Sequence, residues 1–123
     1  MWPVVTTDVF DEWFSDLEPD AQAEVMTKVR VLQVMGPQLG RPHVDTLNGS
    51  RHANMKEIRA KTARQVMRIA FAFNLERTAI LLVAGNKQGA NQRRFYQQLI
   101  EDADRLFDQH LAKLAAKRKK EKE

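Results

Sequence analysis

The sequence predicts an α+β domain with the element order β-α-α-β-β-β-α and a mainly antiparallel sheet. Apolar residues recur at helical spacing within the first 35 residues and again after residue 91. Between these regions, residues 55–84 read as three successive strands. The connections between these strands are short, which favours antiparallel pairing. Helices that gather at the two ends of a chain, apart from its strands, are typical of α+β domains.

The N-terminal third predicts one strand and a pair of helices. Trp2–Val5 is a short strand, and its proline favours a sheet edge or the start of the strand. Thr7 or Asp8 can cap a helix that runs to about Leu17, because their side chains accept hydrogen bonds from the first turn. A second helix, Pro19–Met35, begins on a proline, a favoured residue for a first helical turn. We expect the two helices to form a hairpin over one face of the sheet.

The middle of the chain predicts the sheet itself. Residues 36–54 show no sustained period and are interpreted as a long ordered connection. The strands follow at Met55–Lys61, Gln65–Asn74 and Thr78–Ala84. In the second of these the bulky apolar side chains fall on one face and Arg68 on the other, because successive residues point to opposite faces. The third strand, Thr78–Ala84, has apolar residues on both of its faces, which predicts a central place in the sheet.

A last helix is predicted from about Asn91 to Leu114, where apolar residues form a wide stripe. The domain is expected to span residues 1–112, since 123 residues support a single core. Residues 113–123 form a basic tail with nothing to bury, and we expect this tail to fray.

Charge is strongly separated along the chain. The net charge is +4, and residues 113–123 account for it with six basic and two acidic side chains. Residues 1–24 hold seven acidic residues and no basic one, whereas residues 51–94 hold ten basic residues and two acidic ones. A basic sheet of this kind would attract a phosphate-rich partner.

Several functional classes are excluded by sequence. The chain lacks cysteine and the common catalytic and phosphate-binding motifs, and its three histidines are far apart. We therefore expect no metal and no other cofactor. It has no stretch of about 20 apolar residues that could span a bilayer and no export signal at its N-terminus. These absences predict a cytoplasmic protein with no membrane partner.

The remaining reactive groups are cations and Tyr96, the only tyrosine. Such a set suits RNA cleavage, because RNA carries its own nucleophile in the 2′-hydroxyl beside each phosphate. The protein then has to align that hydroxyl and stabilise charge on the phosphate oxygens. Protonating the leaving oxygen is harder, since arginine and lysine are weak acids near neutral pH.

Several segments together resemble a known family. They are His-Ala-Asn-Met-Lys-Glu-Ile-Arg (52–59), Val-Met-Arg-Ile-Ala-Phe-Ala-Phe (66–73), Leu-Leu-Val-Ala-Gly-Asn-Lys-Gln-Gly (81–89), residues 93–104 and the upstream residues 36–50. The pattern resembles the HigB-like, phage-derived Gp49-like branch of the RelE/ParE toxin superfamily, over nearly the whole chain to about Leu111. The resemblance implies a compact RelE-like fold. It also implies a type II toxin that cleaves messenger RNA, typically on the ribosome, and is silenced by a helix-turn-helix antitoxin.

The resemblance also implies site residues. Arg59, Arg68 and Lys87 match the family's basic cleft residues and would stabilise the phosphorane, while Tyr96 would stack a base or move a proton. One departure is Glu57, which occupies a position where some ribosome-dependent relatives have lysine. Further RNA contacts are expected from exposed basic residues: Lys56, Lys61, Arg64, Arg93 and Arg94.

Other interpretations remain open from the sequence. Arg68 could simply be solvated or paired with Glu57, and Tyr96 beside Phe95 could be a packing residue. A second function is a toxin without nuclease activity that inhibits a protein such as gyrase. A third is a degenerate relative that only binds RNA or antitoxin.

Overall fold

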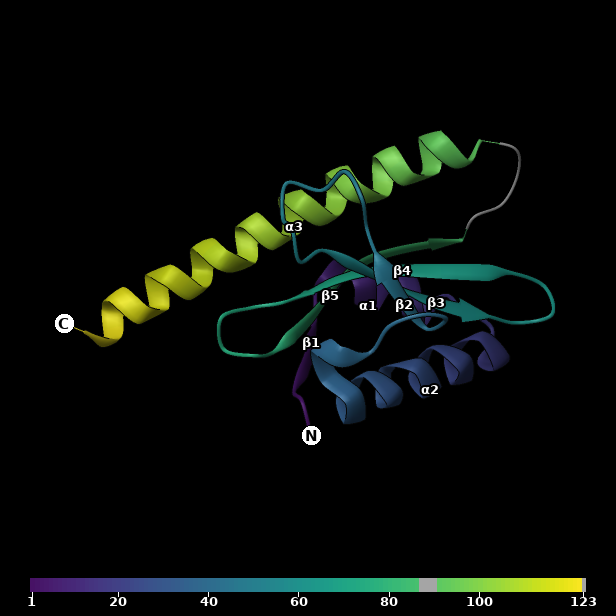
Figure 1. The fold of residues 1–123 in the computed structure, drawn as a ribbon, viewed down its shortest axis with the longest axis horizontal. Coiled ribbons are helices and arrows are strands. Elements are labelled where there is room, and N and C mark those ends of the chain that lie inside the picture. Colours follow the sequence, from purple (N-terminus) through teal and green to yellow (C-terminus); the bar gives the residue numbers. More distant parts are fainter. Residues whose placement is uncertain (87–90, 123) are drawn as a thin grey trace.

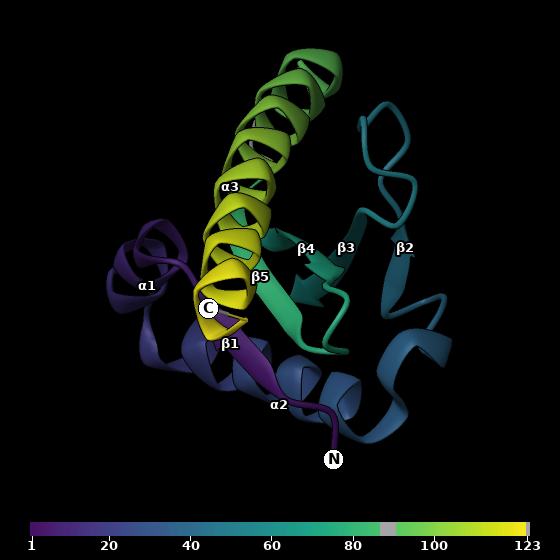
Figure 2. The same cartoon turned by 90° about the vertical axis from the view of Figure 1, so that its left-hand side faces the viewer.

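The computed structural model describes residues 1–86 and 91–122 and shows one five-stranded sheet with helices on both faces (Figures 1 and 2). The strands are β1 (Val4–Thr6), β2 (Val44–Thr46), β3 (Lys56–Lys61), β4 (Val66–Phe73) and β5 (Ala79–Asn86). The helices are α1 (Asp8–Ser15), α2 (Pro19–Met35), the 3-10 turn η1 (Gly36–Gln38) and α3 (Gln92–Glu121). The predicted α+β class is confirmed.

The order of strands across the sheet is β1-β5-β4-β3-β2. Strands β2 to β5 pair with antiparallel neighbours, whereas β1 runs parallel to β5. Strand β5 lies inside the sheet, as predicted, because β1 and β4 flank it, although β4 is the middle strand of the five. Strand β2 was not predicted, since it is three residues long and lies inside the connection 36–54.

The first core lies between the sheet and the pair α1 and α2. Phe10 from α1 and Val25, Val29 and Leu32 from α2 are buried against the large apolar side chains of β4, including Phe71. This face carries the residues that alternation assigns to it, so the predicted helical hairpin over one face is confirmed. Trp2 anchors the N-terminus to the same layer, because its backbone N–H donates to Gln33 O at 2.8 Å.

The second core lies under α3 on the opposite face. Leu99, Ala103 and Phe107 of α3 pack against small residues of β4 and apolar residues of β5. Strand β5 contains a β-bulge at Leu82. Ala70 of β4 pairs with Val83 and Phe71 pairs with Leu81, so Leu82 has no partner on β4. Leu82 and Val83 therefore both belong to the second core, which explains why alternation fails along β5.

Helix α3 continues beyond the predicted end at Leu114. Its C-terminal turns project past the sheet (Figure 1) and are exposed from Ala112 on, apart from partly buried Leu114. The predicted fraying of residues 113–123 stays a prediction. Among the described residues, none of the helices combines the length and the apolar character needed to cross a membrane.

Candidate functional site

The buried carboxylate of Glu57 on β3 accepts hydrogen bonds from three of the predicted site residues. Its Oε1 accepts hydrogen bonds from Arg59 Nε at 3.1 Å, from Arg68 Nη1 at 3.2 Å and from Tyr96 Oη at 3.1 Å. The three donors come from β3, β4 and α3. The structure thus brings Arg59, Arg68 and Tyr96 together, and it does so through a residue that carries the opposite charge.

The sheet register explains why the carboxylate is needed. Arg59 and Arg68 are directly opposite each other in the antiparallel pair β3–β4. Two like charges in this position repel each other and destabilise a sheet. Glu57 lies on the same face as Arg59 because the two are two residues apart on one strand. Its negative charge therefore sits where it compensates both guanidinium groups.

Burial makes this cluster energetically significant. The side chain of Glu57 is 3% exposed and that of Arg68 is 13% exposed, whereas that of Arg59 is 40% exposed. Within the described residues, Glu57 Oε2 and Arg68 Nε are buried without a hydrogen-bond partner. Buried polar atoms are nearly always paired, so two unpaired ones in a single cluster require an explanation.

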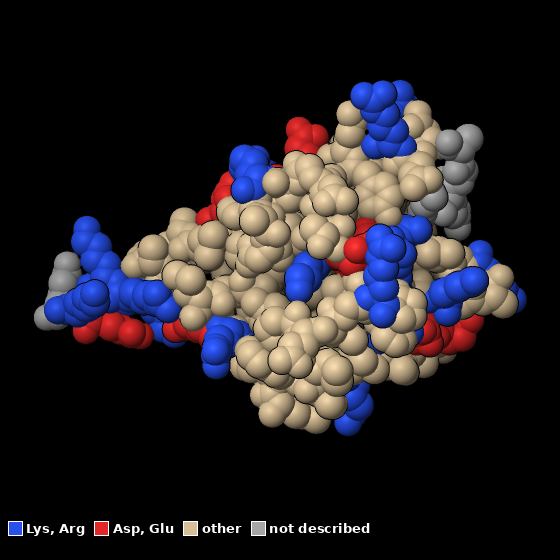
Figure 3. Space-filling model, viewed as in Figure 1, with Lys and Arg blue, Asp and Glu red and all other residues tan. Residues whose placement is uncertain are grey.

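A second carboxylate, that of Asp45 on β2, closes the open side of the cluster. Asp45 Oδ2 accepts from Arg59 Nη2 at 3.2 Å and from Arg41 Nε at 3.1 Å. The hydrogen bond from Arg41 lowers the pKa of Asp45 below its ordinary value, while the hydrogen bond to Glu57 raises that of Arg59. Three arginines and two carboxylates leave this cluster with a net charge of +1. The face is accordingly mixed in charge, with red side chains between blue ones (Figure 3).

Tyr96 is held in its protonated form by its surroundings. Burial and the nearby negative charge of Glu57 raise the pKa of its phenol to about 12. The Arg68 guanidinium carbon lies 5.5 Å from the centre of the Tyr96 ring, a cation–π distance. At neutral pH the phenol is therefore a hydrogen-bond donor that orients Glu57.

Two cavities are lined in part by Tyr96. A cavity of about 260 Å³ is lined by Tyr96 together with Glu57, Arg59, Gln92 and residues 45–48. A wider one of about 690 Å³ is lined by Tyr96 with Arg51 and Arg93. The first volume is of the size of a nucleotide, and the second is lined by two further cations and by the acidic residues Glu101 and Asp104.

The loop between β2 and β3 forms a wall of both cavities and is fastened to α3. Buried Asp104 accepts from the Ser50 hydroxyl and from the Arg51 backbone N–H, the latter at 3.1 Å. One turn later, Asp108 bonds Arg51 and His52, and the hydrogen bond from His52 lowers the pKa of Asp108. This clamp fixes α3, and so Tyr96, relative to the loop that lines the cavities.

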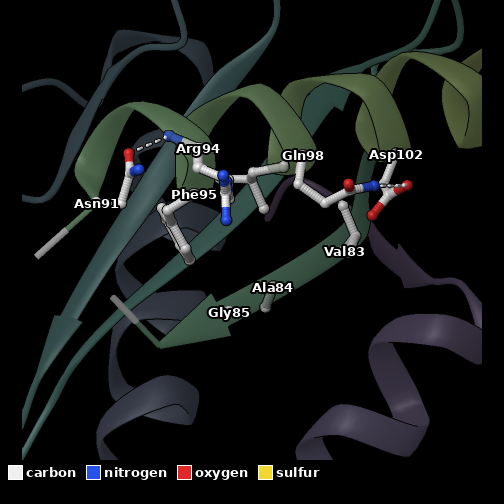
Figure 4. Close-up of a pocket in the computed structure, with 9 residues that line it drawn as sticks. Val83, Ala84, Gly85, Asn91, Arg94, Phe95, Gln98 and Asp102 are labelled. Atoms are coloured by element: carbon white, nitrogen blue, oxygen red, sulfur yellow. Dashed lines mark hydrogen bonds between the residues drawn. The ribbon is translucent and has the colours of Figure 1, made fainter. Parts of the chain in front are cut away.

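A third cleft, of about 540 Å³, lies between α3 and β5 (Figure 4). Phe95 points from the helix toward the strand in the close-up, Gln98 runs along the helix and donates to Asp102 at 3.1 Å, and Arg94 also lines the cleft. The helix approaches β5 closely at Gly85, where a Cβ would meet the Phe95 ring at 2.9 Å. Arg94 therefore belongs to a different cleft from Arg93 and Tyr96.

The remaining predicted site residues are scattered. Lys56 shares the face of Ile58 and donates to Pro37 O at 3.2 Å, which places it on the opposite side of the sheet from Arg68. Lys61 and Arg64 are exposed at the end of β3 and in the turn after it. Lys87 lies outside the described residues. None of these placements tests the predicted RNA contacts, which stay predictions.

Sequence reasoning did not assign Glu57 or Asp45 to the site. Glu57 was noted only as a departure and as a pairing partner for Arg68, and that pairing is what the structure shows. Alternation along β3 places Glu57 and Arg59 on one face, which was the available signal. Among residues 1–86 and 91–122, no group of three or more metal-ligating side chains comes together.

Comparisons with known proteins agree on one family. Residues 12–108 match the family described as "Phage derived protein Gp49-like". The chain is 44% identical over 110 residues to "Putative toxin HigB2" of Mycobacterium tuberculosis, covering 87% of this chain and 54% of that protein. It thus spans about half of that relative's length. It is 42% identical to "Putative toxin HigB3" of the same organism, over 89% of this chain and 93% of that protein.

A solved structure shares the fold. It is a free-state structure of an arginine-to-alanine double mutant of the E. coli toxin RelE, matched with a TM-score of 0.58 at 11% identity. The match covers 81% of this chain and 95% of that one. At this identity the likeness concerns the fold alone.

Proposed function

Because the chain belongs to the Gp49-like family and is a HigB-like member of the RelE toxin superfamily, we propose that it is a toxin that cleaves messenger RNA without a metal. The observation that carries the proposal is the Glu57 carboxylate, which is shared by two arginines and a tyrosine beside a nucleotide-sized cavity. No other cluster in the described residues combines a base, cations and a phenol in this way.

In this mechanism Glu57 takes the proton from the RNA 2′-hydroxyl. Oε2 is the oxygen for that role, since Oε1 already accepts three hydrogen bonds. Because Oε2 is buried in the free chain, RNA binding has to expose it before it can accept the proton. The deprotonated 2′-oxygen forms a bond to the phosphorus, the bond from phosphorus to the 5′-oxygen breaks, and the 5′-oxygen takes up a proton from water, which leaves a 2′,3′-cyclic phosphate and a free 5′-hydroxyl. General-base help of this kind contributes on the order of 10²–10⁴-fold to a rate.

The arginines stabilise the charge that builds on the phosphate oxygens. Their ion pairs with Glu57 do not prevent this. A guanidinium has five N–H donors, and Arg59 and Arg68 each use one of them on Glu57. The pairing orients both groups toward one point, where further donors remain for a phosphate. Lys87, by resemblance, would add a third cation.

Tyr96 acts by position in this proposal. A phenol with a pKa of about 12 is a weak acid at neutral pH. Tyr96 lines both cavities, so a nucleobase could stack on its ring while its hydroxyl holds Glu57. Such stacking is worth about 1–3 kcal/mol per base.

The partners follow from the family. We expect a helix-turn-helix antitoxin that silences the toxin, and messenger RNA bound to the ribosome as the substrate in the cytoplasm. A test adds the purified chain to free messenger RNA with and without excess EDTA, and to ribosomes with message in Mg²⁺ buffer, because ribosomes come apart without Mg²⁺. Cleavage that leaves 2′,3′-cyclic ends is expected, and Arg68→Ala should abolish both cleavage and growth inhibition. Loss of cleavage on chelation, or full activity of Arg68→Ala, would contradict the proposal.

A second function is favoured by one specific observation. Arg59 and Arg68 are both held in internal ion pairs, as expected for a toxin that inhibits a protein target or only binds. Mapping of RNA 5′ ends after induction separates the two functions. Growth arrest without new 5′ ends would support the non-nuclease toxin.

A further inference from the structure

The C-terminal end of α3 is the most basic surface outside the site. Residues 113–122, here called the basic arm, carry six of the chain's cations: Lys113, Lys117, Arg118, Lys119, Lys120 and Lys122. All six are exposed. In Figures 1 and 3 the arm projects beyond the sheet, and blue side chains gather at that end of the molecule.

The fold does not account for this charge. Between the arm and the rest of the described chain, the one ion pair is Arg118 with Glu76 at 4.0 Å, and both side chains are about half exposed. Exposed pairs of this kind contribute about 0–1 kcal/mol. Cations near a helix C-terminus interact favourably with the helix dipole, but two or three of them suffice for that effect.

The spacing of several of the cations opposes the helix, although Glu121 follows Lys117 by four residues and offsets part of the repulsion. Lys113 and Lys117, and likewise Arg118 and Lys122, are four residues apart and therefore adjacent on the helix surface. Like charges at this spacing destabilise a helix. Positions 117, 118, 119 and 120 cover its whole circumference at 3.6 residues per turn. A polyanion would relieve this repulsion.

We propose that the basic arm binds the phosphate backbone of RNA, at a place separate from the catalytic cluster. This inference rests on the proposed function for the identity of the nucleic acid. At 1.5 Å per residue, Lys117 lies about 30 Å along the helix from Tyr96. Residues 101–108 between them hold four acidic side chains and one basic one. RNA does not follow the helix across this acidic stretch, so the arm contacts a different part of the molecule.

The amino-acid composition of the arm limits which parts of RNA it can contact. Residues 111–123 contain only Leu, Ala, Lys, Arg and Glu. They offer no aromatic ring on which a base could stack. Lysine and arginine contacts to phosphate fix position and carry no sequence information. The arm therefore adds affinity for RNA mainly through phosphate contacts that do not depend on sequence.

A salt titration tests the arm independently of cleavage. The probe is a fully 2′-O-methylated RNA single strand, which lacks the nucleophilic hydroxyl and so cannot be cut by 2′-oxygen attack. Each phosphate contact to a single strand contributes about 0.7 to the slope of log affinity against log salt. The double variant Lys117→Gln, Lys120→Gln should lower that slope by about 1.4 relative to the unchanged chain.

A matched control removes the same amount of charge elsewhere. Arg30 on α2 and Arg105 on the acidic stretch of α3 are both exposed, and the double variant Arg30→Gln, Arg105→Gln should leave the slope unchanged. An arm variant with an unaltered slope, or a control with an equal loss, would overturn the inference. Circular dichroism serves as a control, since both double variants should keep the helix content of the unchanged chain.

The same experiment separates this inference from the proposed function. Cleavage is measured in parallel on unmodified RNA. If the chain does not cleave RNA but the arm variant has a lower salt slope, the nuclease proposal fails and the proposal of RNA binding by the arm is supported. If cutting occurs and the slope is unaltered, the arm fails and the nuclease proposal stands.

Discussion

Replacement of Glu57 by glutamine is expected to destabilise the fold by about 3 kcal/mol. Removing one partner from a buried ion pair costs about 3–5 kcal/mol, because the other charge stays buried without compensation. Arg68, at 13% side-chain exposure, is in that position. Arg59, at 40% exposure, adds less than about 1 kcal/mol because solvent screens it. Glutamine keeps the shape and one acceptor oxygen, so the lower end of the range applies.

The measurement is urea and thermal unfolding of the unchanged chain and the variant. A loss of about 3 kcal/mol corresponds to a fall of roughly 10 °C in Tm for a domain of this size. The matched control is Glu76→Gln, since the side chain of Glu76 is 51% exposed and its one ion pair with another described residue is 4.0 Å long. The control should stay within about 0.5 kcal/mol of the unchanged chain.

A double-mutant cycle identifies the cause. In Glu57→Gln, Arg68→Gln the second change removes the uncompensated cation, so the double variant should lose less stability than the sum of the two single variants. A coupling of about 1–3 kcal/mol is expected. Additive single effects, or a Glu57→Gln protein as stable as its control, would refute the reasoning. Cleavage assayed well below the Tm of the variant then separates chemistry from folding.

Three further predictions concern the surroundings of Glu57. Tyr96, the only tyrosine, should titrate near pH 12 when phenolate absorbance is measured. Because the pKa is raised in the folded state, the free energy of unfolding should fall as pH rises above about 10. Glu57→Gln should lower the pKa of Tyr96. Gly85→Ala should cost about 1–3 kcal/mol in urea unfolding by overpacking, because its Cβ would meet the Phe95 ring at 2.9 Å; unchanged stability would count against this close packing. Asp104→Asn should cost about 1–3 kcal/mol and speed amide exchange in residues 47–55; slow exchange would show that the clamp is not needed.

The regular elements were predictable from the sequence, because each carries its own local signal. The apolar stripe of α2 and the alternation along β4 follow from periods of 3.6 and 2 residues. Strand β2 has three residues and is made by pairing with β3, so no local pattern could reveal it. The bulge at Leu82 likewise depends on the partner strand, and a run of apolar residues conceals it.

The cations of the candidate site could be predicted from the sequence, but the role of the carboxylate at its centre could not. Arg59 and Arg68 follow from the motifs of the family and from the alternation of the strands. The role of Glu57 depends on three elements meeting at one atom, including Tyr96, which is 39 residues away along the chain. Positive charge in the sequence does not identify Glu57, although this residue binds both arginines and the tyrosine of the cluster.

Strand β1 sets an order of assembly for the sheet. Strands β2 to β5 are neighbours in sequence and close short loops, whereas the β1–β5 pair joins Val4 to Ala79. Contacts between residues so far apart are slow to form, since the entropy of a long loop must be lost first. We therefore expect β1 to dock late and to open first, so that the amide of Ala79, which donates to Pro3 O, exchanges faster than that of Ile69. A chain emerging from the ribosome would then carry its N-terminal strand undocked until β5 has been made.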